Sequence, residues 1–471
     1  MSLPAPRPIS VAELDLDAPD GGGPALRPAP GGPPVVPGDV YALVRLRGRP
    51  VATVVGAYAA GDDPAEVLAA LARRRLADAG PPRTDAERLA ASRQDRHPTE
   101  PVPRTVSRAD GRTATAPRRT PGPDGHPAAT APGPTDPAPH LSVVLATRER
   151  PRSLARALDS LLVQDHPDHE LIVVDNAPRT SGTHDLVTRQ YAGRVRYVRE
   201  DTPGLAVAHN TGLAAARGAV VAFTDDDVIA DPHWLTALAE PFAADPGLGC
   251  VTGLILPARL RTPAQILLES HGGFAKGFAP RLYDPARPPA DEPLFPFTAG
   301  GFGSGANMAF RAEALRRAGG FDPATGTGTP AKGGDDLYAF VAVLTAGFRL
   351  RYTADALVWH HHRDTWQDLR NQAYGYGAGL TAYLTATLVR SPRLLPALLA
   401  RLPRGLAYAR TMTARRGGTE EAASGSVPGE HRAHHHPWPA ALSRLERRGM
   451  LYGPIGYAKA RIRTRRGKAT P

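Results

Sequence analysis

The chain of 471 residues is poor in cysteine and in aromatic side chains. Its one cysteine, Cys250, cannot form an internal disulfide, which favours a reducing, cytoplasmic compartment. There is no uncharged apolar run of about 18 residues, and no basic segment followed by an apolar one near residue 1, so we expect neither a membrane span nor a signal peptide. Aromatic residues make up 6% of the chain and no recognition-helix motif occurs, which argues against a nucleic-acid-binding protein.

Two common nucleotide-binding motifs are also missing. The first strongly apolar segment, residues 141–147, is not followed by GxGxxG, and the motif GxxxxGK(S/T) does not occur. These absences exclude a dinucleotide-binding fingerprint and a phosphate-binding P-loop. A nucleotide bound by this chain therefore needs a different set of contacts.

Proline and glycine, with 50 and 48 residues, are abundant and clustered, and they divide the chain. We predict six regions: a disordered segment 1–38, a small ββα module 39–80, a disordered basic linker 81–139, a main domain 140–363, an amphipathic helical extension 364–416 and a basic C-terminal tail 417–471. The net charge of +11 is compatible with nucleic acid, an anionic membrane or a polyphosphate substrate as partner.

The main domain alternates between strand-like and helix-like segments. Apolar or strand-like runs occur at 141–147, 171–177, 195–200 and 219–223, and helical patterns lie between them. This order predicts an α/β fold with a doubly wound, mostly parallel sheet and right-handed crossovers. Further on we expect a helix at 232–242, strands at 249–256 and 307–311, a helix at 335–345 and two short strands at 348–352 and 356–358.

Three aspartates, Asp225, Asp226 and Asp227, follow the apolar run 219–223. In an open α/β sheet, ligands bind at the carboxyl ends of the strands. Adjacent carboxylates repel one another unless water or a cation neutralises them, and oxygen ligands suit Mg²⁺ or Mn²⁺. The alternative is an acidic, solvated turn, but the buried strand before it favours a metal site.

Seven motifs in series resemble the inverting family 2 glycosyltransferases with a GT-A fold. They are LSVVLATRER (141–150), IVVDNA (172–177), AHNTGLAAARG (208–218), FTDDD (223–227), GANMAFR (305–311), GGDDL (333–337) and VWHHHR (358–363). The resemblance implies that residues 140–363 form a GT-A catalytic domain, and that the donor substrate is a nucleoside diphosphate sugar.

The resemblance also implies which residues bind the donor. Asp175 accepts a hydrogen bond from the base, with Thr147 at the neighbouring strand end. The remaining candidates on the nucleotide are Arg148, Arg150, Asn210, Arg217, Asp225 and Asp226. For Asn210 and Arg217 the alternatives are a helix cap and a solvated arginine.

Metal and base candidates come from the same resemblance. The metal ligands are Asp225, Asp227 and His360, although the run His360–His362 leaves the histidine open. Asp335 and Asp336 stand at a helix N-terminus, where a carboxylate is favoured; one of them is the catalytic base, with Asp336 preferred, and capping is the alternative. Gly305 and Asn307 would line the acceptor cleft.

The C-terminal region is the least informative. Residues 393–416 combine leucine pairs with arginines, which predicts either a helix on an anionic membrane surface or a helical lid. We therefore expect a cytoplasmic enzyme with peripheral contact at the inner face of the membrane. Alternatives to a glycosyltransferase are a nucleotidyltransferase-like enzyme, or a non-enzymatic protein that binds nucleic acid or membrane through the basic segments.

Overall fold

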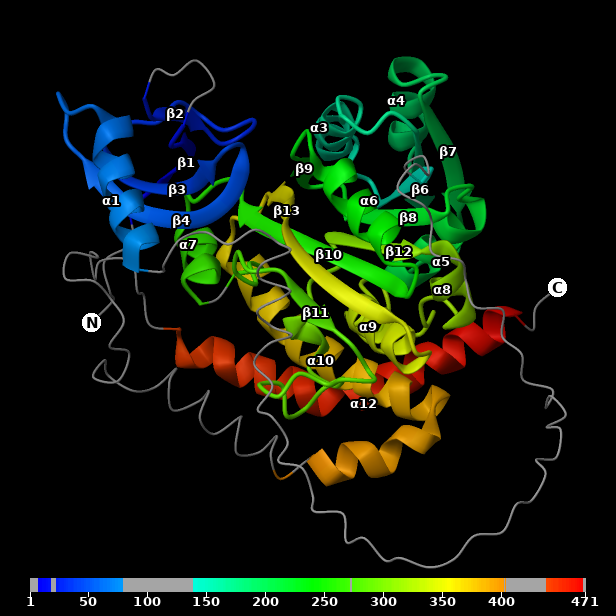
Figure 1. Ribbon diagram of the computed structural model, residues 1–471. Coiled ribbons are helices and arrows are strands. Elements are labelled where there is room, and N and C mark those ends of the chain that lie inside the picture. The colour runs from blue at the N-terminus through cyan, green and yellow to red at the C-terminus, as the bar shows by residue number, and fades with distance from the viewer. Residues whose placement is uncertain are drawn as a thin grey trace, which may run out of the picture.

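The computed structural model describes residues 7–17, 23–78, 139–271, 273–401, 403 and 438–468. The expected linker 81–139 falls almost entirely outside these residues, as do 404–416 of the expected amphipathic extension and 417–437 of the expected tail. Figure 1 shows an N-terminal sheet, a large central sheet and two long C-terminal helices.

The N-terminal unit is a four-stranded sheet covered by one helix. Its strand order is β2-β1-β3-β4. The elements are β1 (Ser10–Asp15), β2 (Ala25–Pro28), β3 (Gly38–Leu46), β4 (Arg49–Tyr58) and α1 (Pro64–Asp78). The prediction of disorder over 1–38 is therefore wrong for β1 and β2, and the module has two more strands than expected. The composition of this segment did not indicate strands, because β1 is short and is stabilised by parallel pairing with β3, a distant segment.

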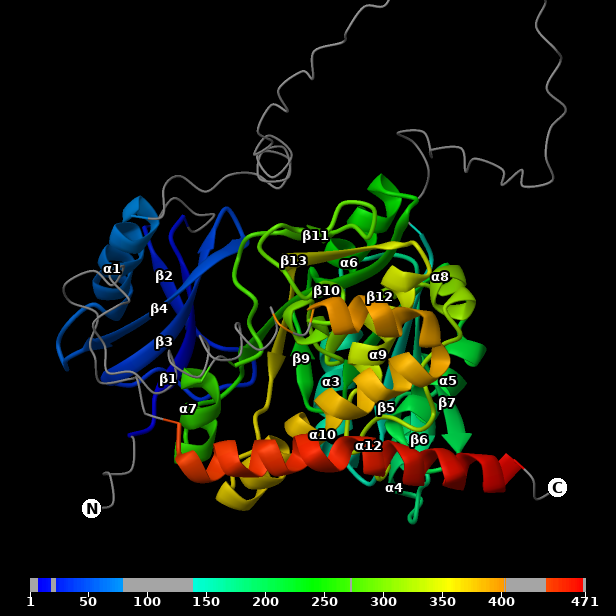
Figure 2. The same ribbon diagram turned by 90° about the horizontal axis from the view of Figure 1, so that it is seen from below.

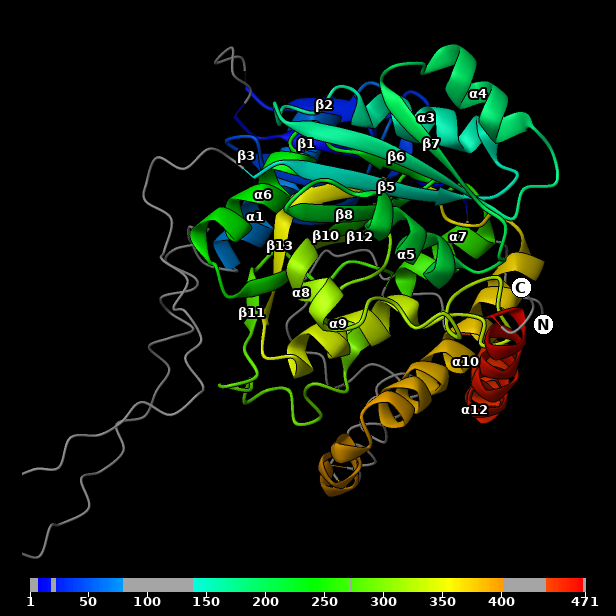
Figure 3. The same cartoon turned by 90° about the vertical axis from the view of Figure 1, so that its right-hand side faces the viewer.

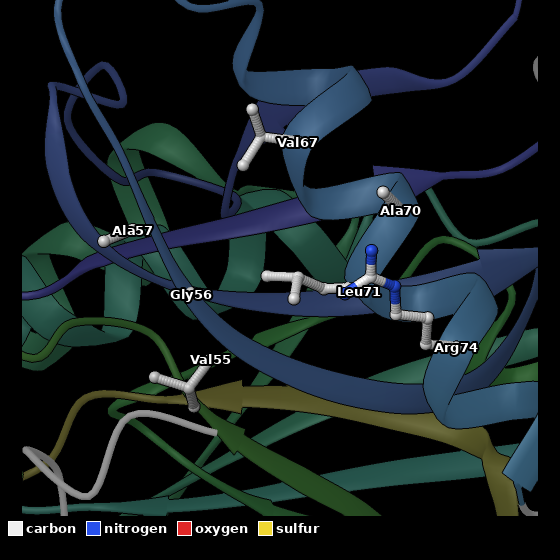
Figure 4. A pocket seen from close by; sticks show the side chains of 7 residues that line it. All are labelled: Val55, Gly56, Ala57, Val67, Ala70, Leu71 and Arg74. Carbon is white, nitrogen blue, oxygen red and sulfur yellow. The ribbon is translucent and has the colours of Figure 1, made fainter. Parts of the chain in front are cut away.

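Both faces of this sheet are buried. Ala12 and Leu14 pack with Leu68 of α1, whereas Tyr41 and Leu43 pack against strands of the central sheet. Strand β3 is apolar on both faces for this reason. Figure 4 shows a shallow hollow between β4 and α1 whose lining is apolar except for Arg74. It carries no acid–base or metal-binding group, so it is not a candidate active site.

The central sheet has nine strands in the order β11-β13-β10-β12-β8-β5-β6-β7, with β9 paired to β13. Their bounds are β5 (Leu141–Thr147), β6 (His169–Asn176), β7 (Val195–Glu200), β8 (Val220–Asp225), β9 (Val228–Ala230), β10 (Leu248–Pro257), β11 (Arg281–Tyr283), β12 (Asn307–Arg311) and β13 (Arg349–His360). Strands β5, β6, β7, β8, β10 and β13 share one direction, and β9, β11 and β12 run against it. The predicted α/β class and mostly parallel sheet are confirmed.

One strand differs from its prediction. The two short strands expected at 348–352 and 356–358 form the single strand β13, whose pairing with β10 shifts register near Gly253 and Leu254. A β-bulge bends a strand without ending it, and the interrupted apolar pattern reflects that bend.

Helices cover both faces of the central sheet (Figure 3). One face packs on α3 (Pro151–Leu161), α4 (Gly182–Gln190) and α6 (Trp234–Ala244). The other packs on α5 (Leu205–Ala215), α8 (Ala312–Arg317) and α9 (Asp335–Thr345). Alternate residues of β5 and β6 enter the two cores, which explains their continuous apolar runs. The connections also contain α7 (Pro263–Ser270) and the 3-10 turns η1 (Ala299–Gly301) and η2 (Pro392–Leu394).

The chain ends in two packed helices, α10 (Trp366–Arg390) and α12 (Ala440–Lys468), which lie side by side in Figures 1 and 2. A side chain at Gly377 would overlap the carbonyl oxygen of Glu446, and one at Gly449 would overlap that of Tyr374. Glycine thus permits the two backbones to touch. Much of the expected basic tail is therefore helix α12. No helix in the described parts of the chain is long and apolar enough to cross a bilayer.

Candidate active site

The acidic residues lie at the carboxyl edge of the parallel strands. Asp225 ends β8 beside Ala146 of β5, and Thr147 ends β5 beside Asp175 of β6. Strand β9 begins directly after Asp227 and pairs with β13, which places Val228 opposite His360. The sheet register therefore brings the end of β13 to the aspartates of β8.

Asp225, Asp227 and His360 form a cluster that can hold a cation. Each offers one ligand atom, and the three atoms lie within 4.8 Å of one another. Nε2 of His360 is 3.3 Å from Oδ1 of Asp227, and the backbone amide of His361 donates to the carbonyl oxygen of Asp227. Two carboxylates and an imidazole suit Mn²⁺ or another divalent ion. The residues present thus fit the expected metal.

The pKa values in the cluster show its electrostatic strain. Burial, together with the charge of Asp227, raises the pKa of Asp225 to about 7. Burial also acts to raise the pKa of Asp227, but the hydrogen bond and charge of His360 and the charge of Arg150 outweigh it and lower that pKa to about 2. A divalent cation would oppose the burial and the repulsion that raise the pKa of Asp225.

The middle aspartate faces away from the cluster. Asp226 accepts hydrogen bonds from Oγ1 of Thr147 at 2.6 Å and from Nη1 of Arg150 at 2.7 Å, and Arg150 also reaches Oδ2 of Asp227 at 3.0 Å. Thr147 and Asp226 are thus bonded to each other, and they anchor the turn after β5. Arg150 leaves part of its guanidinium exposed beside the cluster.

Asp175 has an unsatisfied oxygen at the end of β6. Its Oδ2 accepts from the hydroxyl of Tyr197 at 2.9 Å, whereas its buried Oδ1 has no hydrogen-bond partner among the described residues. Burial raises the pKa of this carboxyl. A buried acceptor without a donor is the group that a nucleotide base would satisfy.

Asn210 and Arg217, two predicted nucleotide contacts, make other contacts in the structure. Both ends of the Asn210 amide bond the backbone of Phe321. Arg217 is exposed and precedes β8, so it lies at the opposite edge of the sheet, where its amide donates to Ser142 and Glu170. Arg148 follows β5 and is half-buried. In the structure, Asn210 thus joins α5 to the loop at Phe321, and Arg217 lies just before β8.

The two aspartates of α9 have different surroundings. Asp336 is partly exposed and accepts from the backbone amides of Gly305 at 2.9 Å and Leu337 at 2.8 Å. Burial, then the charge of Asp335, raises its pKa to about 6. Asp335 is buried, with Oδ2 3.2 Å from Nδ1 of His209. Of the two, Asp336 is the carboxylate that a substrate can reach.

Several residues of the site carried no sequence signal. His209 packs against Phe223 and Phe321, and its Nδ1 lies 3.2 Å from Oδ2 of Asp335, beside the candidate base. Lys276 lies near Asp336: burial lowers the pKa of its ammonium and the aspartate opposes that change. His209 and Lys276 lie near Asp335 and Asp336 because of tertiary packing, which the sequence around each residue does not reveal.

Asn307 also differs from its expected place at the acceptor cleft. Its amide is fully buried and bonds the indole of Trp234 and the carbonyl oxygens of Leu254 and Ala356. It joins β12 to neighbouring strands. Gly305, in contrast, touches Asp336 through its amide.

Comparisons with known proteins agree on the class of this domain. The family model for glycosyl transferase family 2 matches residues 142–318. A pre-mycofactocin glycosyltransferase of Mycobacterium tuberculosis is 29% identical over 245 residues, which is 50% of this chain and 46% of that protein. A validoxylamine A glucosyltransferase of Streptomyces hygroscopicus subsp. limoneus is 37% identical over 131 residues, 26% of this chain and 29% of that protein.

Two further matches are one curated relative and one solved structure. An uncharacterized glycosyltransferase of Nostoc sp. is 34% identical over 112 residues, 23% of this chain and 34% of that protein. A mannosyltransferase from Pyrobaculum calidifontis, solved with GDP-Man and Mn²⁺, overlaps with a TM-score of 0.40 and 23% identity over 72% of this chain and 90% of that one. This chain spans less than half the length of each of the three curated relatives.

Proposed function

We propose that the chain is a family 2 glycosyltransferase, a metal-dependent, inverting enzyme that moves a sugar from a nucleoside diphosphate sugar to an acceptor hydroxyl. The observation that carries the proposal is the convergence of Asp225, Asp227 and His360 within 4.8 Å at the carboxyl edge of the sheet. The unsatisfied oxygen of Asp175 at the same edge supports a base site.

On the donor side, different strand ends have different roles. Asp175 would accept a hydrogen bond from the base, and Asp225, Asp227 and His360 would hold a divalent cation. Such a cation would supply positive charge to stabilise the leaving diphosphate. Arg150 keeps Asp226 and Asp227 oriented and presents a positive guanidinium beside the phosphates.

On the acceptor side, Asp336 acts as the general base. A base that works near neutral pH needs a pKa close to the working pH, and the raised pKa of about 6 meets that need. The amides of Gly305 and Leu337 hold the carboxylate in place. Attack by the deprotonated hydroxyl opposite the leaving diphosphate inverts the anomeric carbon, because one displacement takes place.

Nucleotide release by the purified chain tests this proposal. A panel of UDP-, GDP- and dTDP-sugars, with a glucosyl donor included because one relative is named a glucosyltransferase, is incubated with Mn²⁺ or with EDTA. We expect release from one donor, lost in EDTA and in Asp227→Asn, with opposite anomeric configuration in donor and product. Asp168→Asn is the control, because Asp168 is exposed at the other edge of the sheet.

The acceptor is unknown, so nucleotide binding is measured as well. Calorimetry with UDP, GDP and dTDP should detect binding that needs Mn²⁺ and weakens in Asp227→Asn. Binding of none of these nucleotides, or release that EDTA leaves unchanged, would contradict the proposal.

A further inference from the structure

The outward face of α12 is apolar along a narrow stripe. Leu451 is 80% exposed, and Ile455 and Ile462 are each 53% exposed. Positions four and eleven residues apart fall on one side of an α-helix, so the three side chains form one stripe. The other side of the helix, with Leu442, Gly449 and Tyr457, is buried against the rest of the protein.

Basic residues flank this stripe. The exposed residues of α12 include Arg444, Arg447, Arg448, Lys459, Arg463 and Arg465. No acidic residue occurs from Arg447 to the end of the helix. The helix runs along an edge of the molecule in Figure 2. The stripe lies on the side of the helix opposite Gly449 and Gly453, which touch α10.

We propose that this face of α12 docks on an anionic membrane surface. Exposed leucine and isoleucine enter the boundary between headgroups and acyl chains, while arginine and lysine on either side meet the lipid phosphates. Charge complementarity favours lipid over a second copy of the chain, because two copies of this face would oppose arginine to arginine. The proposal extends to α12 a contact that the sequence suggested for residues 393–416, and it stands apart from the sugar-transfer proposal.

Vesicle sedimentation tests the membrane contact. The purified full chain is mixed with vesicles of phosphatidylcholine alone or with about one third phosphatidylglycerol. We expect binding to the anionic vesicles only, weakened by salt, and reduced at least tenfold in Leu451→Ser/Ile455→Ser. Val163→Ser is the control, because Val163 is exposed on the central domain.

Circular dichroism checks that Leu451→Ser/Ile455→Ser is folded.

A second double variant removes charge. Arg448→Gln/Lys459→Gln should weaken binding by roughly fivefold for each charge removed. Equal binding to both vesicle types, no binding to either, or an undiminished double variant would overturn the proposal. A dimer in ultracentrifugation that Leu451→Ser/Ile455→Ser dissociates would also overturn it, in favour of self-association.

A second observation concerns the metal cluster. Nδ1 of His360 is 3.0 Å from Nδ1 of His362, and Nε2 of His362 is 3.1 Å from Oε2 of Glu269. The hydroxyl of Tyr41, from β3 of the N-terminal sheet, donates to Oε1 of Glu269 at 3.4 Å. A chain of hydrogen bonds thus connects the N-terminal sheet with Asp227 through His360.

The chain of bonds determines which ring nitrogens carry protons. A carboxylate only accepts, so Nε2 of His362 is the donor to Glu269. A neutral imidazole has one N–H, which leaves Nδ1 of His362 as the acceptor from Nδ1 of His360. Without a cation, Nε2 of His360 lies 3.3 Å from Oδ1 of Asp227 and donates to it. When His360 is neutral with its proton held on Nδ1, Nε2 offers its lone pair to a cation in place of that hydrogen bond.

We infer that His362 and Glu269 are positioning residues that keep Nε2 of His360 ready to bind the cation. This inference rests on the proposed metal site and adds residues to it. Groups that hydrogen-bond a metal-binding histidine raise affinity by fixing its tautomer and ring orientation, and their loss costs about 10- to 100-fold.

Direct titration with Mn²⁺ tests the inference without any sugar substrate. His362→Phe and Glu269→Leu should weaken Mn²⁺ binding by about 10- to 100-fold. Glu269→Gln keeps an acceptor oxygen and should restore part of the affinity, which a purely structural role would not predict. His233→Gln is the control, because His233 is half exposed and pairs with Asp165 away from the cluster.

Electron spin-echo spectroscopy adds a signature of coordination. We expect nitrogen modulation from imidazole in the Mn²⁺ complex of the wild type and its loss in His362→Phe. If the wild type binds Mn²⁺ and His362→Phe binds it equally well, the positioning role fails while the metal site stands. If the wild type binds no Mn²⁺, the proposed metal dependence itself fails, and this role with it.

Discussion

The pH dependence of turnover follows from the raised pKa of Asp336. With a pKa of about 6, the carboxylate is about 91% ionised at pH 7 and about 9% ionised at pH 5. If Asp336 must be ionised to take the acceptor proton, kcat falls about tenfold between pH 7 and pH 5. A carboxyl with an ordinary pKa near 4 would lose only about a tenth of the rate over the same interval.

The assay is initial-rate nucleotide release at saturating donor and Mn²⁺ between pH 4.5 and 8, with water as the acceptor. Saturating Mn²⁺ is needed because Asp225, with a pKa near 7, also titrates in this range and changes metal affinity. Asp336→Asn removes the base and should lower kcat by about 10²- to 10⁴-fold. Asp335→Asn should cost less, since Asp335 is buried against His209.

A melting curve separates loss of the base from loss of the fold. The fold gains from protonating Asp336, because its pKa in the native state lies above that of the unfolded chain; this gain is complete below pH 4 and disappears as the pH rises through 6. Asp336→Asn should therefore not melt at a lower temperature at pH 7. A rate that stays flat from pH 7 to pH 5, or an Asp336→Asn enzyme with near-normal kcat, would refute the assignment.

Three further outcomes are expected. Arg45→Met leaves Asp231 and Glu13 buried without their cation and should cost about 3–5 kcal/mol in urea unfolding, whereas Arg49→Met, which removes an exposed arginine 3.7 Å from its partner, should cost under about 1 kcal/mol. Gly449→Leu forces α12 away from α10 and should lower the free energy of unfolding by about 1–3 kcal/mol, measured as a lower melting temperature. Asp175→Asn replaces the free acceptor with an amide and should weaken nucleotide binding about 10- to 100-fold by calorimetry, with no change in Mn²⁺ binding.

Strong local patterns predicted most of the central domain. The strand at 195–200 and the strand at 307–311 have the bounds expected from sequence, because each is a short apolar or alternating run between clear breaks. The N-terminal strand β1 escaped notice because its six residues lie in a proline- and glycine-rich stretch. Its stability comes from pairing with β3 and from burial between two cores, which no local pattern encodes.

The residues of the candidate site also fall into two groups, those named from motifs and those brought in by tertiary packing. Asp225, Asp227 and His360 were named from motifs, and the pairing of β9 with β13 brings them together. His209 and Lys276 were not, since their neighbours come from distant parts of the sequence. Arg217 shows what a motif leaves open: its position before β8 puts it a full strand length from the carboxyl edge, which the strand bounds reveal and the motif does not.

The N-terminal sheet bears on the active site through β13. Tyr41 and Leu43 share a hydrophobic core with Leu254 and with Trp359, the residue before His360. The buried ion pair between Arg45 and Asp231 fixes the end of β9, which in turn pairs with β13 beside the cluster. Packing, an ion pair and the Tyr41–Glu269 hydrogen bond thus act on the same strand end. Since a cation site tolerates little displacement of its ligands, we propose that the sheet supports the position of His360. Its removal should weaken Mn²⁺ binding more than nucleotide binding at Asp175, as titration of each ligand would measure.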